Sequence, residues 1–201
     1  MGERFRYLAL GDSYTIGEGV AEADRWPTQL AQRLRESGVS VANPEIVART
    51  GWTTDELDAA ISDRAFRGPY ALVTLLIGVN NQYRNRGVAE FCTELRSLIA
   101  RAVAFAGGDA QHVILVSIPD WGVTRFNTSR NRDFVAREID SYNAVARDEA
   151  QCAAVHWVDI TDLTRATPDE VVADGLHPNA AMYRQWTSRL SEVATAILRQ
   201  R

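Results

Sequence analysis

A serine near the start of the chain and an Asp–His pair near its end have the residue types of a nucleophilic catalyst. Ser13 follows an apolar stretch over residues 5–10, in the sequence LGDSYTIGEGV. Asp174 and His177 stand three residues apart in ADGLHPN, just before a helical pattern. A histidine can take the proton of a serine hydroxyl while a carboxylate holds the histidine in the required tautomer. These three residues therefore predict an acyl transfer that proceeds through the serine.

Five short apolar runs predict the strands that would carry such a site. They are nearly continuous in hydrophobicity, which is typical of parallel strands covered on both faces. The runs are residues 5–10, 45–49, 70–78, 112–118 and 154–160.

Helical patterns separate these runs. Residues 26–37 form one pattern, with Pro27 at an acceptable first-turn position. Thr53 and Glu56 have the spacing of a capping box at the start of another helix. Longer helices are expected over residues 88–106 and 131–152, and the last helix has an apolar stripe of Met182, Trp186, Leu190, Val193 and Ile197.

This alternation of strands and helices predicts an α/β fold. We expect a three-layer α/β/α sandwich around a five-stranded parallel sheet, of the flavodoxin-like, doubly wound type, with residues 1–201 forming a single domain. Such sheets bind their ligands outside the carboxyl ends of the strands. Chemistry is therefore expected where each predicted strand ends.

Polar and glycine residues follow the first three predicted strands. Ser13 follows the first strand, Gly51 the second and Asn80 the third. Acyl transfer needs hydrogen-bond donors aimed at the developing oxyanion, and the N–H groups of Ser13 and Gly51 with the Asn80 amide are candidates. Each short motif alone also suits an ordinary turn, since glycine and asparagine both favour turns.

Four blocks taken together resemble the SGNH hydrolases, the GDSL-type esterase and lipase superfamily. They are GDSY after the first strand, glycine 51 after the second, G-V-N after the third and D-x-x-H before the last helix. The resemblance extends over the whole chain through the strand framework. It implies that Ser13 is the nucleophile, His177 the base and Asp174 its orienting partner. It also implies an oxyanion hole from Ser13 N–H, Gly51 N–H and the Asn80 amide.

Two residues depart from the common pattern of the superfamily. Tyr14 stands where leucine is commonest, and Asn81 stands where aspartate often follows the catalytic asparagine. Neither position performs the chemistry, but both weaken any transfer of substrate preference. We expect the substrate pocket to include residues in or near the loops that follow the strands: Tyr14, Trp52, Asn81, Tyr83, Trp121 and Phe126.

The expected reaction is hydrolysis of a small carboxylic ester through an acyl-enzyme. Aromatic walls suit either an acyl chain or a sugar face. The absence of a long apolar lid segment favours short acyl groups and water-soluble esters. A carbohydrate O-acetyl esterase, a lysophospholipase or thioesterase, and an acyltransferase remain alternatives. A flavodoxin-like phosphate- or nucleotide-binding module using residues 13–19 is the non-enzyme alternative, but it leaves Asp174 and His177 unexplained.

Composition and charge indicate which partners this chain is expected to lack. The 201 residues carry a net charge of −4, with scattered arginines, so we expect no nucleic-acid partner. No apolar stretch is long enough to span a bilayer, and we expect a cytoplasmic protein without stable membrane insertion. Two isolated cysteines, Cys92 and Cys152, do not form a zinc-site pattern, and a serine hydrolase needs no cofactor or metal. The oligomeric state is left open.

Overall fold

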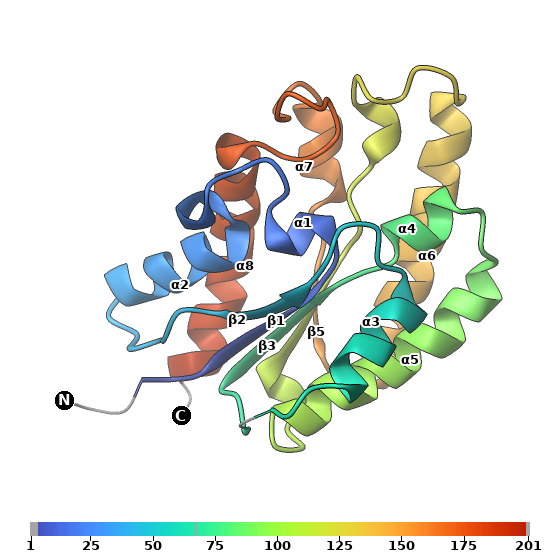
Figure 1. Cartoon of the computed structure of the whole chain (residues 1–201). Coiled ribbons are helices and arrows are strands. Elements are labelled where there is room, and N and C mark those ends of the chain that lie inside the picture. The colour runs from blue at the N-terminus through green and yellow to red at the C-terminus, as the bar shows by residue number, and fades with distance from the viewer. Residues whose placement is uncertain (1–3, 67, 200–201) are drawn as a thin grey trace.

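One parallel sheet forms the middle layer of the protein (Figure 1). The computed structural model describes residues 4–66 and 68–199. Within these ranges the five strands lie in the order β2-β1-β3-β4-β5, and all neighbouring pairs are parallel. The strands are β1 (Tyr7–Gly11), β2 (Glu45–Ala48), β3 (Leu72–Leu76), β4 (Val113–Val116) and β5 (His156–Val158). The predicted five-stranded parallel sheet is confirmed.

The strand order brings the ends of β1 and β3 together. From β1 the chain runs outward to β2 and then returns across β1 to β3, so β1 has a neighbour on each side. Gly11 at the end of β1 is in register with both Ala48 and Leu76. A crevice forms at such a reversal, outside the carboxyl ends of the strands. Ser13 follows β1 and Asn80 follows β3, so both lie at this crevice.

Among the described residues, five longer helices cover the two faces of the sheet. Helices α2 (Trp26–Glu36) and α8 (Ala180–Arg199) pack together on one face, and α3, α5 and α6 lie on the other (Figure 1). The latter are α3 (Thr54–Ser62), α5 (Val88–Phe105) and α6 (Arg132–Cys152). The predicted three-layer α/β/α sandwich is therefore confirmed.

Local sequence accounts for these helices. Pro27 lies in the first turn of α2, where its missing N–H costs nothing. Thr53 and Glu56 form the predicted capping box of α3 through reciprocal hydrogen bonds with the backbone. In α8, the predicted stripe faces the core: Met182, Trp186, Leu190 and Ile197 are buried, and Val193 is half-buried against the same core.

Several short elements were not predicted. Those that follow strands at the carboxyl edge of the sheet are α1 (Ser13–Ile16), α4 (Val79–Tyr83), α7 (Thr161–Ala166) and the 3₁₀ turns η1 (Glu22–Asp24) and η3 (Trp121–Val123), whereas the turn η2 (Ala110–His112) precedes β4. Helices of one turn are too short to show a 3.6-residue hydrophobic period. These elements nevertheless carry Ser13, Asn80 and Trp121.

The fifth strand is shorter than predicted at its amino end. Ala154 has a φ of +56°, and the Val155 N–H donates to the carbonyl of Ala150 in the last turn of α6. Residues 153–155 therefore terminate the helix rather than extend the strand. Across the described residues, none of the helices has the length and apolar character needed to cross a membrane.

Candidate active site

Ser13, His177 and Asp174 lie in one hydrogen-bonded chain, although 164 residues separate the first two. His177 Nε2 lies 2.9 Å from Ser13 Oγ, and His177 Nδ1 lies 2.6 Å from Asp174 Oδ2. Ser13 and His177 are 4% and 7% exposed, whereas the Asp174 side chain is 41% exposed. A proton can move from the serine to the histidine in this arrangement, while the carboxylate supports the far side of the ring.

Backbone hydrogen bonds hold the Asp174 carboxylate in place. Its Oδ1 atom accepts the N–H groups of Leu176 at 2.8 Å and His177 at 3.0 Å, which leaves Oδ2 for the imidazole. Partial burial raises the pKa of Asp174, but the hydrogen bonds from His177 and from the Leu176 and His177 backbone outweigh burial and lower the pKa below its usual value. The carboxylate therefore stays ionised near neutral pH.

Asp12 shapes the turn that presents Ser13. Its Oδ1 atom accepts the Tyr14 N–H at 3.0 Å, and its carbonyl accepts the N–H groups of Thr15 and Ile16. The chain thus leaves β1 and turns into α1 within two residues, with Ser13 at the first helical position. Asp12 is completely buried, and this burial raises the pKa of its carboxyl to about 7.

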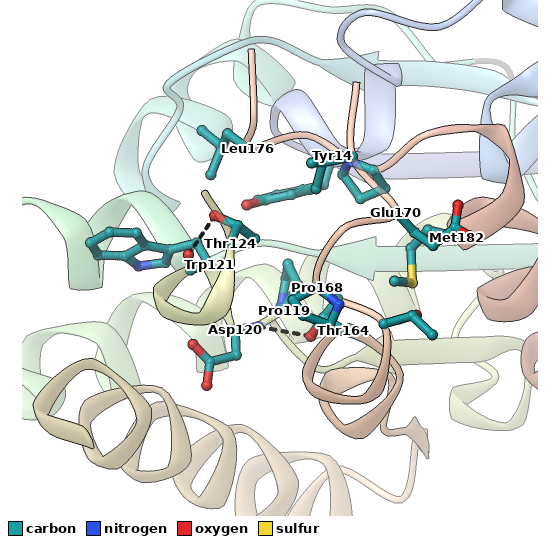
Figure 2. Close-up of a pocket in the computed structure, with 13 residues that line it drawn as sticks. Tyr14, Pro119, Asp120, Trp121, Thr124, Thr164, Pro168, Glu170, Leu176 and Met182 are labelled. Atoms are coloured by element: carbon teal, nitrogen blue, oxygen red, sulfur yellow. Dashed lines mark hydrogen bonds between the residues drawn. The ribbon is translucent and has the colours of Figure 1, made fainter. Parts of the chain in front are cut away.

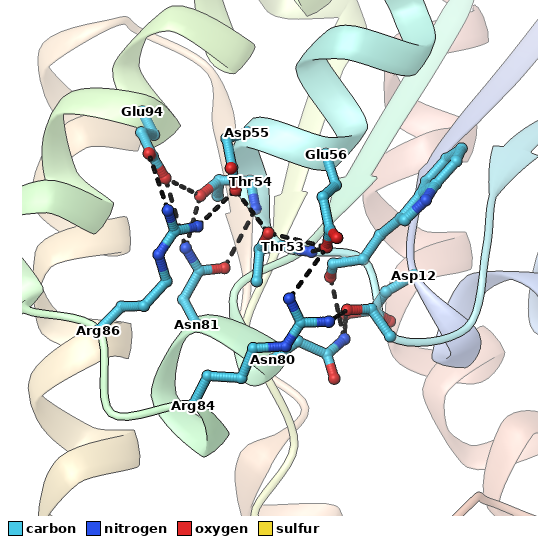
Figure 3. Close-up of polar contacts among 12 residues, drawn as sticks. Asp12, Thr53, Thr54, Asp55, Glu56, Asn80, Asn81, Arg84, Arg86 and Glu94 are labelled. Atoms are coloured by element: carbon cyan, nitrogen blue, oxygen red, sulfur yellow. Dashed lines mark hydrogen bonds and ion pairs between the residues drawn. The ribbon is translucent and has the colours of Figure 1, made fainter.

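The loop that carries Gly51 and Trp52 is tied to helix α4, which carries Asn80 (Figure 3). Arg84 Nη2 donates to the Gly51 carbonyl at 2.6 Å, and Asn80 Nδ2 donates to the Trp52 carbonyl at 2.9 Å. Gly51 has a φ of +84°, a conformation that side chains with a Cβ rarely adopt. Asn80 Nδ2 also lies 3.5 Å from Asp12 Oδ2, which is long for a hydrogen bond.

Asn81 points away from the site, so its expected place in the substrate pocket is wrong. Its side chain is completely buried, and its Oδ1 atom accepts the Thr54 N–H at 3.1 Å. Its Nδ2 atom donates to Thr54 Oγ1 at 2.6 Å and lies 3.4 Å from Glu94 Oε2. Figure 3 shows these contacts joining α4, α3 and α5. Asn81 therefore fixes the helix that carries Asn80 and does not meet a ligand.

Ser13 and His177 open into a cavity of about 120 Å³. Its walls combine the candidate site residues with apolar and aromatic side chains: Ser13, Tyr14, Thr50, Gly51, Val79, Asn80, Tyr83, Trp121, Phe126, Leu176 and His177. Of the residues expected to line the pocket, Tyr14, Tyr83, Trp121 and Phe126 do so. Tyr83 and Trp121 meet edge to face, with ring centroids 5.2 Å apart. Aromatic side chains thus form one side of the cavity.

Trp52 was also expected in this pocket and is absent from the described residues that line it. Its ring packs, partly buried, against the hydrophobic core. Trp52 contacts the site through its backbone carbonyl and not through its indole ring, because the carbonyl accepts the hydrogen bond of the Asn80 amide.

The profile of the GDSL-like lipase/acylhydrolase family matches residues 9–185. This match covers most of the chain and includes every residue of the hydrogen-bonded chain described above. The protein belongs to the GDSL-like lipase/acylhydrolase family. A comparison with curated protein sequences gave no match.

Solved structures share the fold of this GDSL hydrolase. TesA has a TM-score of 0.79 at 20% identity, over 96% of this chain and 99% of TesA. The lipase/acylhydrolase from Enterococcus faecalis has a TM-score of 0.75 at 22% identity, over 96% and 97% of the two chains. A variant of Axe2, an acetyl-xylooligosaccharide esterase from Geobacillus stearmophilus, has a TM-score of 0.70 at 21% identity, over 96% and 95%.

Sequence reasoning missed several residues of the GDSL hydrolase site. Val79 and Leu176 line the cavity. Each directly precedes a candidate site residue, Asn80 or His177, and this position in the sequence could have indicated that they line the pocket. Arg84 holds the Gly51 carbonyl from 33 residues away, and no local pattern marks that contact. Across the described ranges, no group of three or more His, Cys, Asp or Glu side chains could hold a metal ion.

Asp120 also follows a strand of the GDSL hydrolase, but its carboxylate is engaged elsewhere. It is completely buried and accepts the Gly122 N–H at 2.9 Å. Its Oδ2 atom pairs with Arg165 Nε at 2.8 Å. Asp174, not Asp120, is therefore the carboxylate in contact with His177.

The raised pKa of Asp12 predicts a pH-dependent stability that Asp12→Asn removes. Because the folded carboxyl has a pKa of about 7 against 3.8 ordinarily, the folded state holds a proton that the unfolded state has lost. The free energy of unfolding should fall between pH 5 and 8, by on the order of 2 kcal/mol. The asparagine keeps the Tyr14 N–H contact and should lack this fall.

Urea unfolding of the wild type and of Asp12→Asn at pH 5 and pH 8 measures the difference. Other titrating groups are common to both proteins, so they cancel in the comparison. Carboxylates with lowered pKa values, such as Asp174 and Glu149, are already ionised in this window and do not change. The same pH dependence in both proteins would show that Asp12 is ionised throughout.

Proposed function

We propose that this GDSL hydrolase is a serine esterase that cleaves carboxylic esters with short acyl groups through an acyl-enzyme. The observation that carries the proposal is the unbroken contact from Ser13 through His177 to Asp174 at the wall of a cavity. A nucleophile, a base and a group that orients the base are the three parts that acyl transfer requires.

The proposed reaction has two halves. His177 Nε2 takes the proton of Ser13 Oγ as that oxygen bonds to the acyl carbon, and the carbonyl oxygen becomes an oxyanion. The imidazolium then gives its proton to the leaving alcohol, and the ester C–O bond breaks. Water enters, loses a proton to His177 and attacks the acyl-enzyme, which releases the acid and restores Ser13. His177 Nδ1 keeps its proton throughout and donates it in a hydrogen bond to the Asp174 carboxylate.

We assign the oxyanion hole to the backbone N–H groups of Ser13 and Gly51 and to the Asn80 amide. All three residues line the cavity that contains Ser13 Oγ. One Asn80 N–H is held by the Trp52 carbonyl, which fixes the plane of the amide. The same nitrogen also lies 3.5 Å from Asp12 Oδ2, which is a long contact, and a substrate oxyanion would offer its second N–H a better acceptor.

The size of the cavity supports short acyl groups. Its volume of about 120 Å³ is well below the roughly 300–1,000 Å³ of pockets that enclose drug-sized ligands. A second candidate is de-acetylation of a carbohydrate. The exposed rings of Tyr83 and Phe126 beside Trp121 offer a face for a sugar, and one similar structure is an acetyl-xylooligosaccharide esterase.

Hydrolysis of p-nitrophenyl esters from acetate to decanoate tests the proposal, together with release of acetate from acetylated xylo-oligosaccharides. We expect kcat/KM to be highest for acetate to butyrate. Diethyl p-nitrophenyl phosphate should modify Ser13 stoichiometrically, as peptide mass mapping would show. No ester hydrolysis and no modification of Ser13 would overturn the serine mechanism. A preference for the sugar ester by more than tenfold would select the second candidate.

Removing the Asn80 amide should lower catalysis without unfolding the protein. We expect Asn80→Ala to reduce kcat by about 10²–10³-fold with little change in KM, because the amide would act mainly on the transition state. Steady-state kinetics on the best p-nitrophenyl ester measures this effect.

Asn81→Ala is the matched control on the same helix. It removes the contacts with Thr54 and Glu94 outside the cavity, so it should lower the unfolding midpoint and leave kcat within about tenfold of wild type. Equal losses of kcat in both variants would mean that Asn80 acts only by holding α4.

A further inference from the structure

A second, smaller hollow shares part of its lining with the Ser13 cavity, and Figure 2 shows the residues that line it. It has a volume of about 10 Å³, which is the space of about one water. Prolines and other apolar side chains from four segments form part of its wall: Pro119, Pro168, Val171, Leu176, Pro178 and Met182. No group described above as part of the chemistry uses this hollow.

Tyr14 stands between the hollow and the Ser13 cavity. Three side chains, Tyr14, Trp121 and Leu176, line both spaces. In Figure 2 the Tyr14 ring lies above Pro119 and Thr164, which line the hollow. The residue directly after Ser13 is therefore part of the wall between them.

The Tyr14 ring is held in this position from several directions. Its centroid lies 5.4 Å from that of His177 and 6.2 Å from that of Trp186. The Tyr183 hydroxyl donates to the Tyr14 carbonyl at 3.1 Å, and Tyr14 is only 3% exposed. Burial raises the pKa of its phenol well above the usual value, so the ring stays neutral. A ring packed in this way is a fixed wall rather than a mobile gate.

We propose that Tyr14 sets the acyl chain length that this enzyme accepts, by closing the Ser13 cavity against the apolar hollow. The inference rests on the proposed esterase function and adds the residue that determines its specificity. With the ring in place, an acyl chain ends within the cavity of about 120 Å³. With a smaller side chain, the cavity and the hollow become one apolar space that takes additional methylenes.

Tyr14→Leu is the variant that tests the wall, because it removes the ring and keeps an apolar side chain. Each additional buried methylene strengthens binding by a factor of about four. We therefore expect the ratio of kcat/KM for p-nitrophenyl octanoate over p-nitrophenyl butyrate to rise at least about tenfold above wild type. An unchanged ratio in an active variant would overturn the proposal.

Met182→Ala is the matched control, since Met182 lines the hollow but not the Ser13 cavity. It enlarges the hollow behind an intact Tyr14, so the ratio should stay within about twofold of wild type. In the double variant Tyr14→Leu/Met182→Ala, the ratio should exceed that of Tyr14→Leu alone. A rise with Met182→Ala alone would show that Tyr14 is not the barrier.

A binding experiment without catalysis separates this inference from the proposed function. In a Ser13→Ala background, we would measure the affinities of 1-butanol and 1-octanol by calorimetry, with and without Tyr14→Leu. The ratio of the two affinities should shift toward 1-octanol by at least about tenfold when the ring is removed. No shift overturns the role of Tyr14 whatever the kinetics show. If the affinity ratio shifts but the wild type cleaves no ester, the role of Tyr14 as a wall is supported and the proposed esterase function is overturned.

Discussion

Ser13→Ala is expected to lower kcat by on the order of 10⁶-fold on any ester that this GDSL hydrolase cleaves. The substitution removes the atom 2.9 Å from His177 Nε2, so the base has no nucleophile to activate. Asp174 cannot compensate, because it contacts the other ring nitrogen. Only the slow attack of water, helped by the donors around the cavity, would remain.

The measurement is single-turnover and steady-state hydrolysis of the best p-nitrophenyl ester, with active-site titration of the wild type. Ser141→Ala is the matched control: this serine lies exposed on α6, donates to the Arg137 carbonyl and does not line the cavity. It should keep wild-type kcat. A Ser13→Ala protein with more than about a tenth of wild-type activity would contradict the serine mechanism.

Asp174→Asn should be the second most damaging substitution, with kcat reduced by about 10³–10⁴-fold. Asp174 Oδ1 accepts two backbone N–H groups, from Leu176 and His177, and an asparagine oxygen would keep that place. The asparagine NH₂ would then face His177 Nδ1 and require that nitrogen to be an acceptor. The ring proton would move to Nε2, which is the nitrogen that must accept the proton of Ser13.

Asp174→Ala separates the tautomer effect from the loss of charge. The alanine removes the carboxylate but leaves the histidine free to take either tautomer, so this variant should retain more activity than Asp174→Asn. Because the Asp174 side chain is 41% exposed, water can partly replace the missing carboxylate. Steady-state kinetics of both variants at pH 7 to 9 measure the difference. Wild-type activity in Asp174→Asn would contradict a role for Asp174 in orienting His177.

The strands and long helices of this protein could be predicted from the sequence because their signals are local. The continuous apolar runs marked buried parallel strands, and Thr53 with Glu56 marked the start of α3. The one-turn helices α1, α4 and α7 are too short to show a 3.6-residue hydrophobic period, so the sequence does not predict them. The start of β5 was predicted too early because residues 153–155 close α6 through contacts that apolar composition does not show.

The assembly of Ser13, His177 and Asp174 could also be predicted, although they are far apart in the chain. Parallel strands bring their carboxyl ends to one edge of a sheet, so residues that follow those strands meet there. A serine, a histidine and an aspartate that meet at this edge of the sheet together indicate nucleophilic catalysis more than any structural role. The structure brings them into hydrogen-bonding distance.

The sequence by itself therefore determined the succession of strands and long helices along the chain, the family and the residues that could do chemistry. Only the tertiary structure decided where individual loop side chains point. Asn81 turns inward because Thr54 and Glu94 meet it there, Arg84 reaches back to the Gly51 carbonyl, and Tyr14 becomes a wall because His177 and Trp186 pack against its ring. The physical reason is that hydrophobic periods and caps act between near neighbours, whereas a loop side chain takes its direction from partners many residues away.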